Sequence, residues 1–151
     1  MATFSPVEYT AQTAVPPTPL DPTQDKGRVR IAHFDLTGIV SGSIGDVIQC
    51  CKLPAGKVRV LRYCNKHGSW AASSTFSLGN AAYTRSSDKT TVAASATSVA
   101  AAVTMNNSTD VDVLAGVVFD STTGVLIQGT VAGAAGGTLP SSLGWIEYVQ
   151  D

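Results

Sequence analysis

Charged side chains are scarce in this sequence. Asp, Glu, Lys and Arg make up 14% of its 151 residues, against about 25% in an average soluble domain. The formal net charge is −1, so no strong field attracts the chain to nucleic acid or to an anionic membrane surface. Small Ser, Thr, Ala and Gly side chains take the place of the charges. Such a surface suits a protein that packs against neighbours, and we expect an oligomer that binds neither nucleic acid nor a membrane.

Long apolar runs are missing too. No stretch approaches the about 18 apolar residues that a membrane-spanning helix needs, and the first residues lack the basic region and apolar run of a secretory signal. The sequence contains three cysteines, and an odd number favours free thiols over a disulfide framework. We therefore expect a chain that is made and kept in a cytoplasm.

The first part of the chain lacks helix-compatible sequence, because prolines gather there. Five of the seven prolines precede residue 23, namely Pro6, Pro16, Pro17, Pro19 and Pro22. Proline fixes φ and has no N–H to donate. We predict an extended arm at residues 1–26 and a single domain at 27–151. The arm either hangs free or docks on a partner, and four apolar side chains favour docking: Phe4, Val7, Tyr9 and Leu20.

Short β-type runs, divided by Gly, Asn, Asp and Ser, follow the arm. Alternating or β-branched stretches lie at 28–36, 46–53, 57–64, 75–78, 111–119, 124–131 and 143–149. Their spacing is typical of sandwiches and jelly rolls. The sequence therefore predicts an all-β domain, a β-sandwich or jelly roll of about seven to eight strands.

Two segments do not fit the strand pattern. Residues 88–103 are rich in alanine and could form one short helix capped by Ser87 or Asp88, although their Thr, Ser and Val content leaves a strand or a loop open. Residues 132–142 contain three glycines and should be mobile or shaped by contacts.

Gly56 and Lys57 invite comparison with a phosphate-binding loop. Such a loop needs a second glycine, a Ser or Thr after the lysine and a following helix. Here a strand pattern follows instead. Pro54 and Gly56 suit a turn, so we interpret this stretch as a hairpin or corner.

Cys50, Cys51, Cys64 and His67 have spacings that resemble part of a zinc site. However, adjacent cysteines on a strand point to opposite sides, so the four could not converge. We expect packing thiols, no metal and no cofactor. No carboxylate near Cys64 and His67 orients them for catalysis, and we expect no enzyme; a site built around Cys64 or Asp46 from distant segments is the least favoured alternative.

Basic residues cluster in two predicted strands: Arg28, Arg30, Lys57, Arg59 and Arg62. Strict alternation places Arg62 on the opposite face from Lys57 and Arg59. The five form either a solvated face or a contact with an acidic surface of another subunit.

Two tryptophans could contact a partner or stack on a sugar. Trp145 lies in an alternating run and is expected in the core, whereas Trp70 follows Gly68 and Ser69 in a loop and is the better contact residue. A carbohydrate- or receptor-binding module that uses Trp70 and Tyr83 is the alternative function.

Several stretches together resemble the head decoration, or cement, proteins of tailed bacteriophages. They are Asp46-Val-Ile, Lys52-Leu-Pro-Ala-Gly-Lys-Val-Arg-Val-Leu, Ser74-Thr-Phe-Ser-Leu-Gly-Asn-Ala and the closing Glu147-Tyr-Val-Gln-Asp. The similarity covers residues 44–79 and the last ten. The arm, the cysteine pair and the basic strand have no counterpart in the pattern.

The resemblance implies a β-sandwich or jelly-roll protein that binds the outside of an assembled capsid. Its partners would be the major capsid protein and further copies of itself, as a homotrimer rather than a homodimer. It would be made in the host cytoplasm and reside on the capsid surface of the virion. Under the alternative function, the carbohydrate- or receptor-binding module would belong to a phage tail or fibre.

Overall fold

The computed structural model describes residues 28–41, 44–105, 110–134 and 137–150, and all regular structure within these residues is β-strand. The long strands are β1 (Val29–Asp35), β3 (Val47–Leu53), β4 (Gly56–His67), β5 (Thr75–Asn80), β8 (Ser95–Thr104), β9 (Val111–Leu114), β10 (Val118–Ser121), β11 (Val125–Ala132) and β13 (Ser142–Gln150). The short ones are β2 (Val40–Ser41), β6 (Tyr83–Thr84), β7 (Thr91–Val92) and β12 (Gly137–Thr138). The predicted all-β fold is confirmed.

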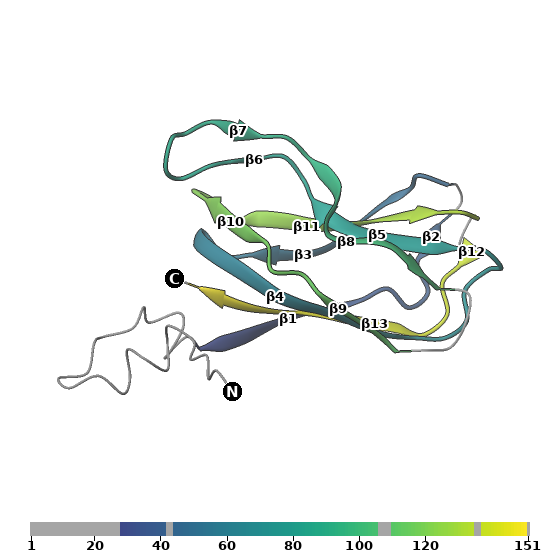
Figure 1. Cartoon of the computed structure of the whole chain (residues 1–151). Helices are drawn as coiled ribbons and strands as arrows, with labels where there is room; N and C mark the ends of the chain where they lie inside the picture. Colours follow the sequence, from purple (N-terminus) through teal and green to yellow (C-terminus); the bar gives the residue numbers. More distant parts are fainter. Residues whose placement is uncertain (1–27, 42–43, 106–109, 135–136, 151) are drawn as a thin grey trace, which may run out of the picture.

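Two antiparallel sheets face each other (Figure 1). Sheet 1 has the order β1-β13-β4-β10, with β9 also paired to β4, and sheet 2 has the order β3-β11-β5-β8. The chain passes from sheet to sheet so that first and last strands are neighbours, which is the connectivity of a jelly roll. Short pairs, β2 with β12 and β6 with β7, extend the loops.

The core lies between the sheets. Its largest fully buried side chains include Tyr63, Phe76, Leu53, Leu78, Ile127 and Ile146. Each sheet also places a glycine beneath an aromatic ring on the core side. A Cβ on Gly129 would lie 1.9 Å from Phe76, and one on Gly144 would lie 2.2 Å from Phe34. The rings thus occupy the space that side chains at these two positions would need.

Two β-bulges reverse the alternation of side chains. The pairing of β11 with β3 skips Cys50, and the pairing of β13 with β4 skips Leu61. After each extra residue, the side chains of the strand point to the face opposite to the one that strict alternation predicts. The predicted separation of the basic residues was therefore wrong, because the bulge at Leu61 places Arg62 on the same face as Lys57 and Arg59.

Residues 53–56 form the predicted turn, and of the two alternatives, a hairpin or a corner, it is the corner between the two sheets. β3 belongs to sheet 2 and β4 to sheet 1, so the chain changes sheet here instead of closing a hairpin. Gly56 has φ +102°, a value that favours glycine. Because Gly56 and Lys57 open a strand, no helix N-terminus is available to hold a phosphate.

The possible helix at 88–103 was wrong, and the strand alternative is confirmed. Residues from Ser95 onward form β8, which pairs with β5 and buries Val99 and Ala100. Sheet pairing here overrides the helix preference of alanine.

The glycine-rich loop is shaped by contacts in its described part, since Leu139 is buried and its N–H donates to the Ile39 carbonyl at 2.8 Å. The predicted arm at 1–26 lies outside the described residues.

Candidate interaction surface

Large apolar side chains are exposed mainly on one side of the molecule. Among the described residues, seven are exposed: Val29, Ile31, Ile44, Val47, Leu114, Val118 and Leu143. Five of them belong to strands of sheet 1, on β1, β9, β10 and β13. Exposed apolar patches of this kind mark interaction surfaces.

The strand register shows that these five side chains share the outer face of sheet 1. Ile31 lies opposite Glu147, Glu147 opposite Arg62, and Arg62 opposite Leu114. Directly paired residues of neighbouring strands point to the same side. In a second row across the sheet, Val29 lies opposite Val149, Val149 opposite Arg59, and Arg59 opposite Val118. Leu143 lies opposite Asp35, which is on the same face of β1 as Ile31.

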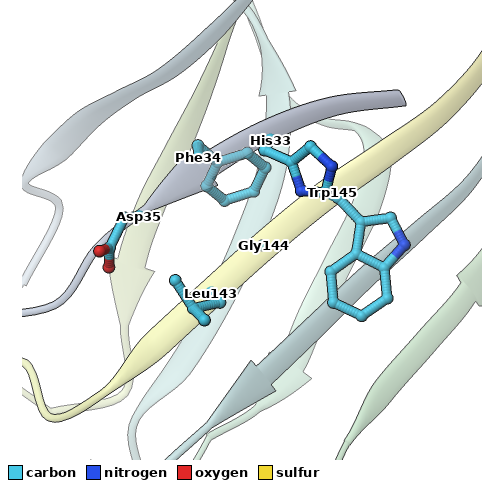
Figure 2. A pocket seen from close by; sticks show the side chains of 6 residues that line it. All are labelled: His33, Phe34, Asp35, Leu143, Gly144 and Trp145. Carbon is cyan, nitrogen blue, oxygen red and sulfur yellow. The ribbon is translucent and has the colours of Figure 1, made fainter. Parts of the chain in front are cut away.

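A depression of about 400 Å³ lies on the β1–β13 half of this face. Its lining comes from two neighbouring strands: His33, Phe34 and Asp35 of β1, and Leu143, Gly144 and Trp145 of β13. Figure 2 shows the His33 ring beside the Trp145 indole, with Leu143 and the Asp35 carboxylate further along the strands. The centroids of the two rings are 6.5 Å apart. The hollow is thus mainly apolar and aromatic, with a carboxylate at one end.

The β4–β9 half of the face carries the charges. Arg62 donates through Nε and Nη2 to both carboxylate oxygens of Asp112, and this contact lowers the pKa of Asp112. Both side chains are about half exposed, where such a pair contributes at most about 1 kcal/mol. Arg59 Nε is buried and has no hydrogen-bond partner among the described residues. Glu147 lies opposite Arg62, and Asp120 lies opposite Lys57. This half therefore combines apolar groups with charges of both signs.

The outer face of sheet 2 differs. Its central strand β11 places Leu126, Gln128 and Thr130 outward, all half-buried, and Gln128 pairs with Gln49. Val47, 54% exposed, is the large apolar side chain exposed on β3. The two outer faces thus have distinct chemistry, and sheet 1 presents the apolar one.

The cysteines are packing residues. Burial raises the pKa of Cys50 to about 12 and that of Cys51 to about 11, and both side chains pack against the core. Their predicted opposite orientation was wrong, because the bulge at Cys50 intervenes. The described residues contain no group of His, Cys, Asp and Glu that could hold a metal.

No nucleophile is assembled at Cys64. Its register partner Trp145 lies on the outer face of sheet 1, whereas His67 is buried, pairs with Ser142 and directs its ring toward Trp70. Cys64 and His67 therefore lie on opposite faces of β4, and burial raises the pKa of the Cys64 thiol.

The two tryptophans have exchanged their expected places. Trp70 is 4% exposed and packs edge-on against Phe76, with 5.5 Å between the ring centroids. Its prediction as a contact residue was therefore wrong. Trp145 is half-buried on the outer face, where it lines the depression. The available signal was Glu147, since a charged residue two positions away marks the solvent side of the strand. Tyr83 is half-buried against Phe119.

The remaining predicted residues are dispersed. Arg28 and Arg30 are exposed at the start of sheet 1, where Arg30 donates to Gln150 Oε1 at 3.0 Å. Lys57 is exposed at the start of β4. The four apolar arm residues lie outside the described part: Phe4, Val7, Tyr9 and Leu20. No helix in the described residues has the length and apolar character to cross a membrane.

No protein-family model matches the sequence, and no curated protein matches it. Solved structures share the fold. A chain of the cyanophage Pam1 capsid asymmetric unit has a TM-score of 0.60 and 17% identity over 83% of this chain and 86% of that chain. A chain of the capsid of Ralstonia phage GP4 has a TM-score of 0.59 and 19% identity over 89% of this chain and 90% of that chain. A VP2 protein of infectious bursal disease virus has a TM-score of 0.50 and 17% identity, with 82% of this chain covering 32% of that one. At sequence identities this low, the structural similarity shows a shared fold and nothing further.

Proposed function

We propose that the chain is a structural protein of a phage virion that binds the outer surface of an assembled capsid and stabilises it. One observation carries the proposal. A jelly roll shared over most of both lengths with chains of two phage capsids exposes five large apolar side chains on a single sheet face.

The proposed contact with the major capsid protein is the β4–β9–β10 half of that face. Leu114, 84% exposed, and Val118, 41% exposed, supply apolar area. Lys57, Arg59 and Arg62 supply positive charge on the same face, beside the carboxylates of Asp112, Asp120 and Glu147. Such a mixture suits a coat surface with charges of both signs, since apolar burial contributes about 25 cal/mol per Å² and complementary charges steer orientation and association. Arg28 and Arg30 would extend the contact at the start of sheet 1.

The arm at residues 1–26 supplies the second proposed contact. Phe4, Val7 and Tyr9 would bind the coat protein next to the site of the jelly roll, and Leu20 would support them. Two linked contacts bind more tightly than either alone, because the second becomes intramolecular. A homo-oligomer, a trimer rather than a dimer in this proposal, multiplies the effect. The role is mechanical and not enzymatic.

Co-sedimentation of the purified protein with capsids of its own phage tests the proposed face. Leu114→Asp should weaken capsid binding at least tenfold, because it replaces the most exposed apolar side chain of the proposed contact with a carboxylate. Val47→Asp is the matched control, since it introduces the same charge at an exposed valine on sheet 2 and should bind like the unchanged protein.

Circular dichroism must show that both variants fold. Full binding by Leu114→Asp, or an equal loss in Val47→Asp, would contradict the proposed face. Very few copies per particle relative to coat protein would contradict the lattice-wide role and point to a tail component.

The carbohydrate-binding alternative loses the residue on which it depended, because Trp70 is buried. Tyr83 packs against Phe119 with 5.9 Å between the ring centroids. We therefore propose the capsid role alone.

A further inference from the structure

The depression on the β1–β13 half of the outer face is not used by the proposed capsid contact. Its lining combines the half-buried Trp145 indole, the exposed His33 ring and the half-exposed Leu143 side chain. This is an aromatic groove of the type that binds proline-rich segments in the extended polyproline II conformation.

The same chain contains such a segment. Residues 16–19 read Pro16-Pro17-Thr18-Pro19, with prolines at the first and fourth positions. We propose that this segment docks in the depression of its own molecule, with proline rings against Trp145 and His33. Proline pre-organises the extended conformation, so docking costs little conformational entropy.

The reach of the chain agrees with this assignment. Along β1, His33 lies five steps after Arg28, a distance of about 17 Å at the rise of a strand. The nine steps from Pro19 to Arg28 can span up to about 30 Å. The segment can therefore turn back over β1 and reach Trp145 without leaving its own molecule.

The path between the two points is apolar. Val29 and Ile31, 51% and 52% exposed, lie on the outer face between the start of β1 and His33. A chain laid along β1 would cover both before it reached the depression. A short tether also gives a segment a local concentration on the order of millimolar, which favours its own molecule over a second copy. Phe4, Val7 and Tyr9 remain free for the capsid.

A spin label at residue 18 of the full chain tests the inference. Thr18→Cys is labelled with a nitroxide at neutral pH, where burial protects Cys50, Cys51 and Cys64 and raises the pKa of all three. Unsubstituted protein, treated in the same way, controls for labelling elsewhere. The NMR signal of the Trp145 indole N–H should disappear and return when the nitroxide is reduced, whereas the Gln128 side-chain amide on sheet 2 should stay visible.

Two comparisons make the result decisive. Pro16→Ser with Pro19→Ser in the labelled chain should restore the Trp145 signal, and Pro6→Ser, outside the segment, should not. The second comparison mixes two proteins: ¹⁵N-enriched protein that carries no nitroxide, and nitroxide-carrying protein of natural isotope abundance. The Trp145 signal of the ¹⁵N-enriched protein should stay intact in this mixture.

Loss of the Trp145 signal in that mixture would show docking from a second copy and overturn the proposal. So would an unaffected Trp145 signal in the labelled chain, or equal broadening of Trp145 and Gln128.

Discussion

At the scale of single residues, the core is shaped by what is missing from two positions. Gly129 and Gly144 lie in the centres of β11 and β13, where glycine normally weakens a strand. In both places an aromatic ring occupies the vacant volume. Phe76 lies above Gly129, is fully buried and also packs against Trp70, with 5.5 Å between the ring centroids. The ring is held from several sides and cannot move aside at low cost.

Gly129→Ala should therefore destabilise the protein. A Cβ at this position would lie 1.9 Å from Phe76 Cζ, and overpacking of this kind costs about 1–3 kcal/mol. Urea denaturation, followed by circular dichroism, would measure the loss of unfolding free energy. Thr130→Ala, one residue along on the outer face, is the control and should change it by less than about 0.5 kcal/mol. Equal effects of the two substitutions would contradict the packing argument.

At the scale of elements, the sequence predicts where strands lie better than which way their side chains point. The periodic runs at 46–53, 57–64, 124–131 and 143–149 all proved to be strands. The bulges at Cys50 and Leu61 were not predicted, because a bulge is set by the partner strand and leaves no local signal. Both change the face of the residues that follow.

The errors at the candidate surface have the same non-local origin. Trp70 is buried because its segment folds back, with the Trp70 backbone N–H donating to the Met105 carbonyl at 2.9 Å. Ser95–Thr104 is a strand because β5 lies beside it: the Ser95 carbonyl oxygen would be 1.9 Å from a Cβ on Gly79. Neither contact can be inferred from neighbouring residues in the sequence.

The effect of the bulge at Leu61 on the direction of the side chains of β4 can be tested by deletion. Deleting Leu61 removes the extra residue, so Val60 and Arg62 become adjacent and can pair with Tyr148 and Glu147 without a shift. Arg62 then stays outward and Tyr63 inward, so we expect the deletion variant to keep a cooperative urea transition. Its midpoint should fall, because the Leu61 carbonyl no longer accepts from the Ala115 N–H. Leu61→Ala keeps the bulge and is the control. Loss of the cooperative transition in the deletion variant alone would show that the fold requires the bulge.

At the scale of the whole molecule, the two outer faces of the jelly roll differ in chemistry. The outer face of sheet 1 is apolar with charges of both signs, and that of sheet 2 presents amides, hydroxyls and small groups. Such a molecule has a defined side for attachment. The proposed function needs that polarity, because a stabilising protein must bind the assembled shell better than free coat subunits.

The proposed stabilisation has a concentration dependence. Adding purified protein to capsids that lack it should raise the temperature at which the particles disrupt, until the sites are filled. Binding at 100 times the dissociation constant contributes about 2.7 kcal/mol per site. Light scattering during heating would record the shift, and Leu114→Asp at the same concentration should produce a smaller one. Saturated binding without any shift would leave attachment but remove the stabilising role.

The pairing of the first long strand with the last has a practical consequence. Val29 lies opposite Val149, and Arg30 is hydrogen-bonded to Gln150. A cargo protein fused to the C-terminal end of β13 would emerge beside the start of β1, on the path proposed for the proline-rich segment. The β6–β7 hairpin, whose turn at Ser87–Thr90 is exposed and closed by its own hydrogen bonds, is a better insertion point for a foreign peptide, including under the proposed role on a capsid.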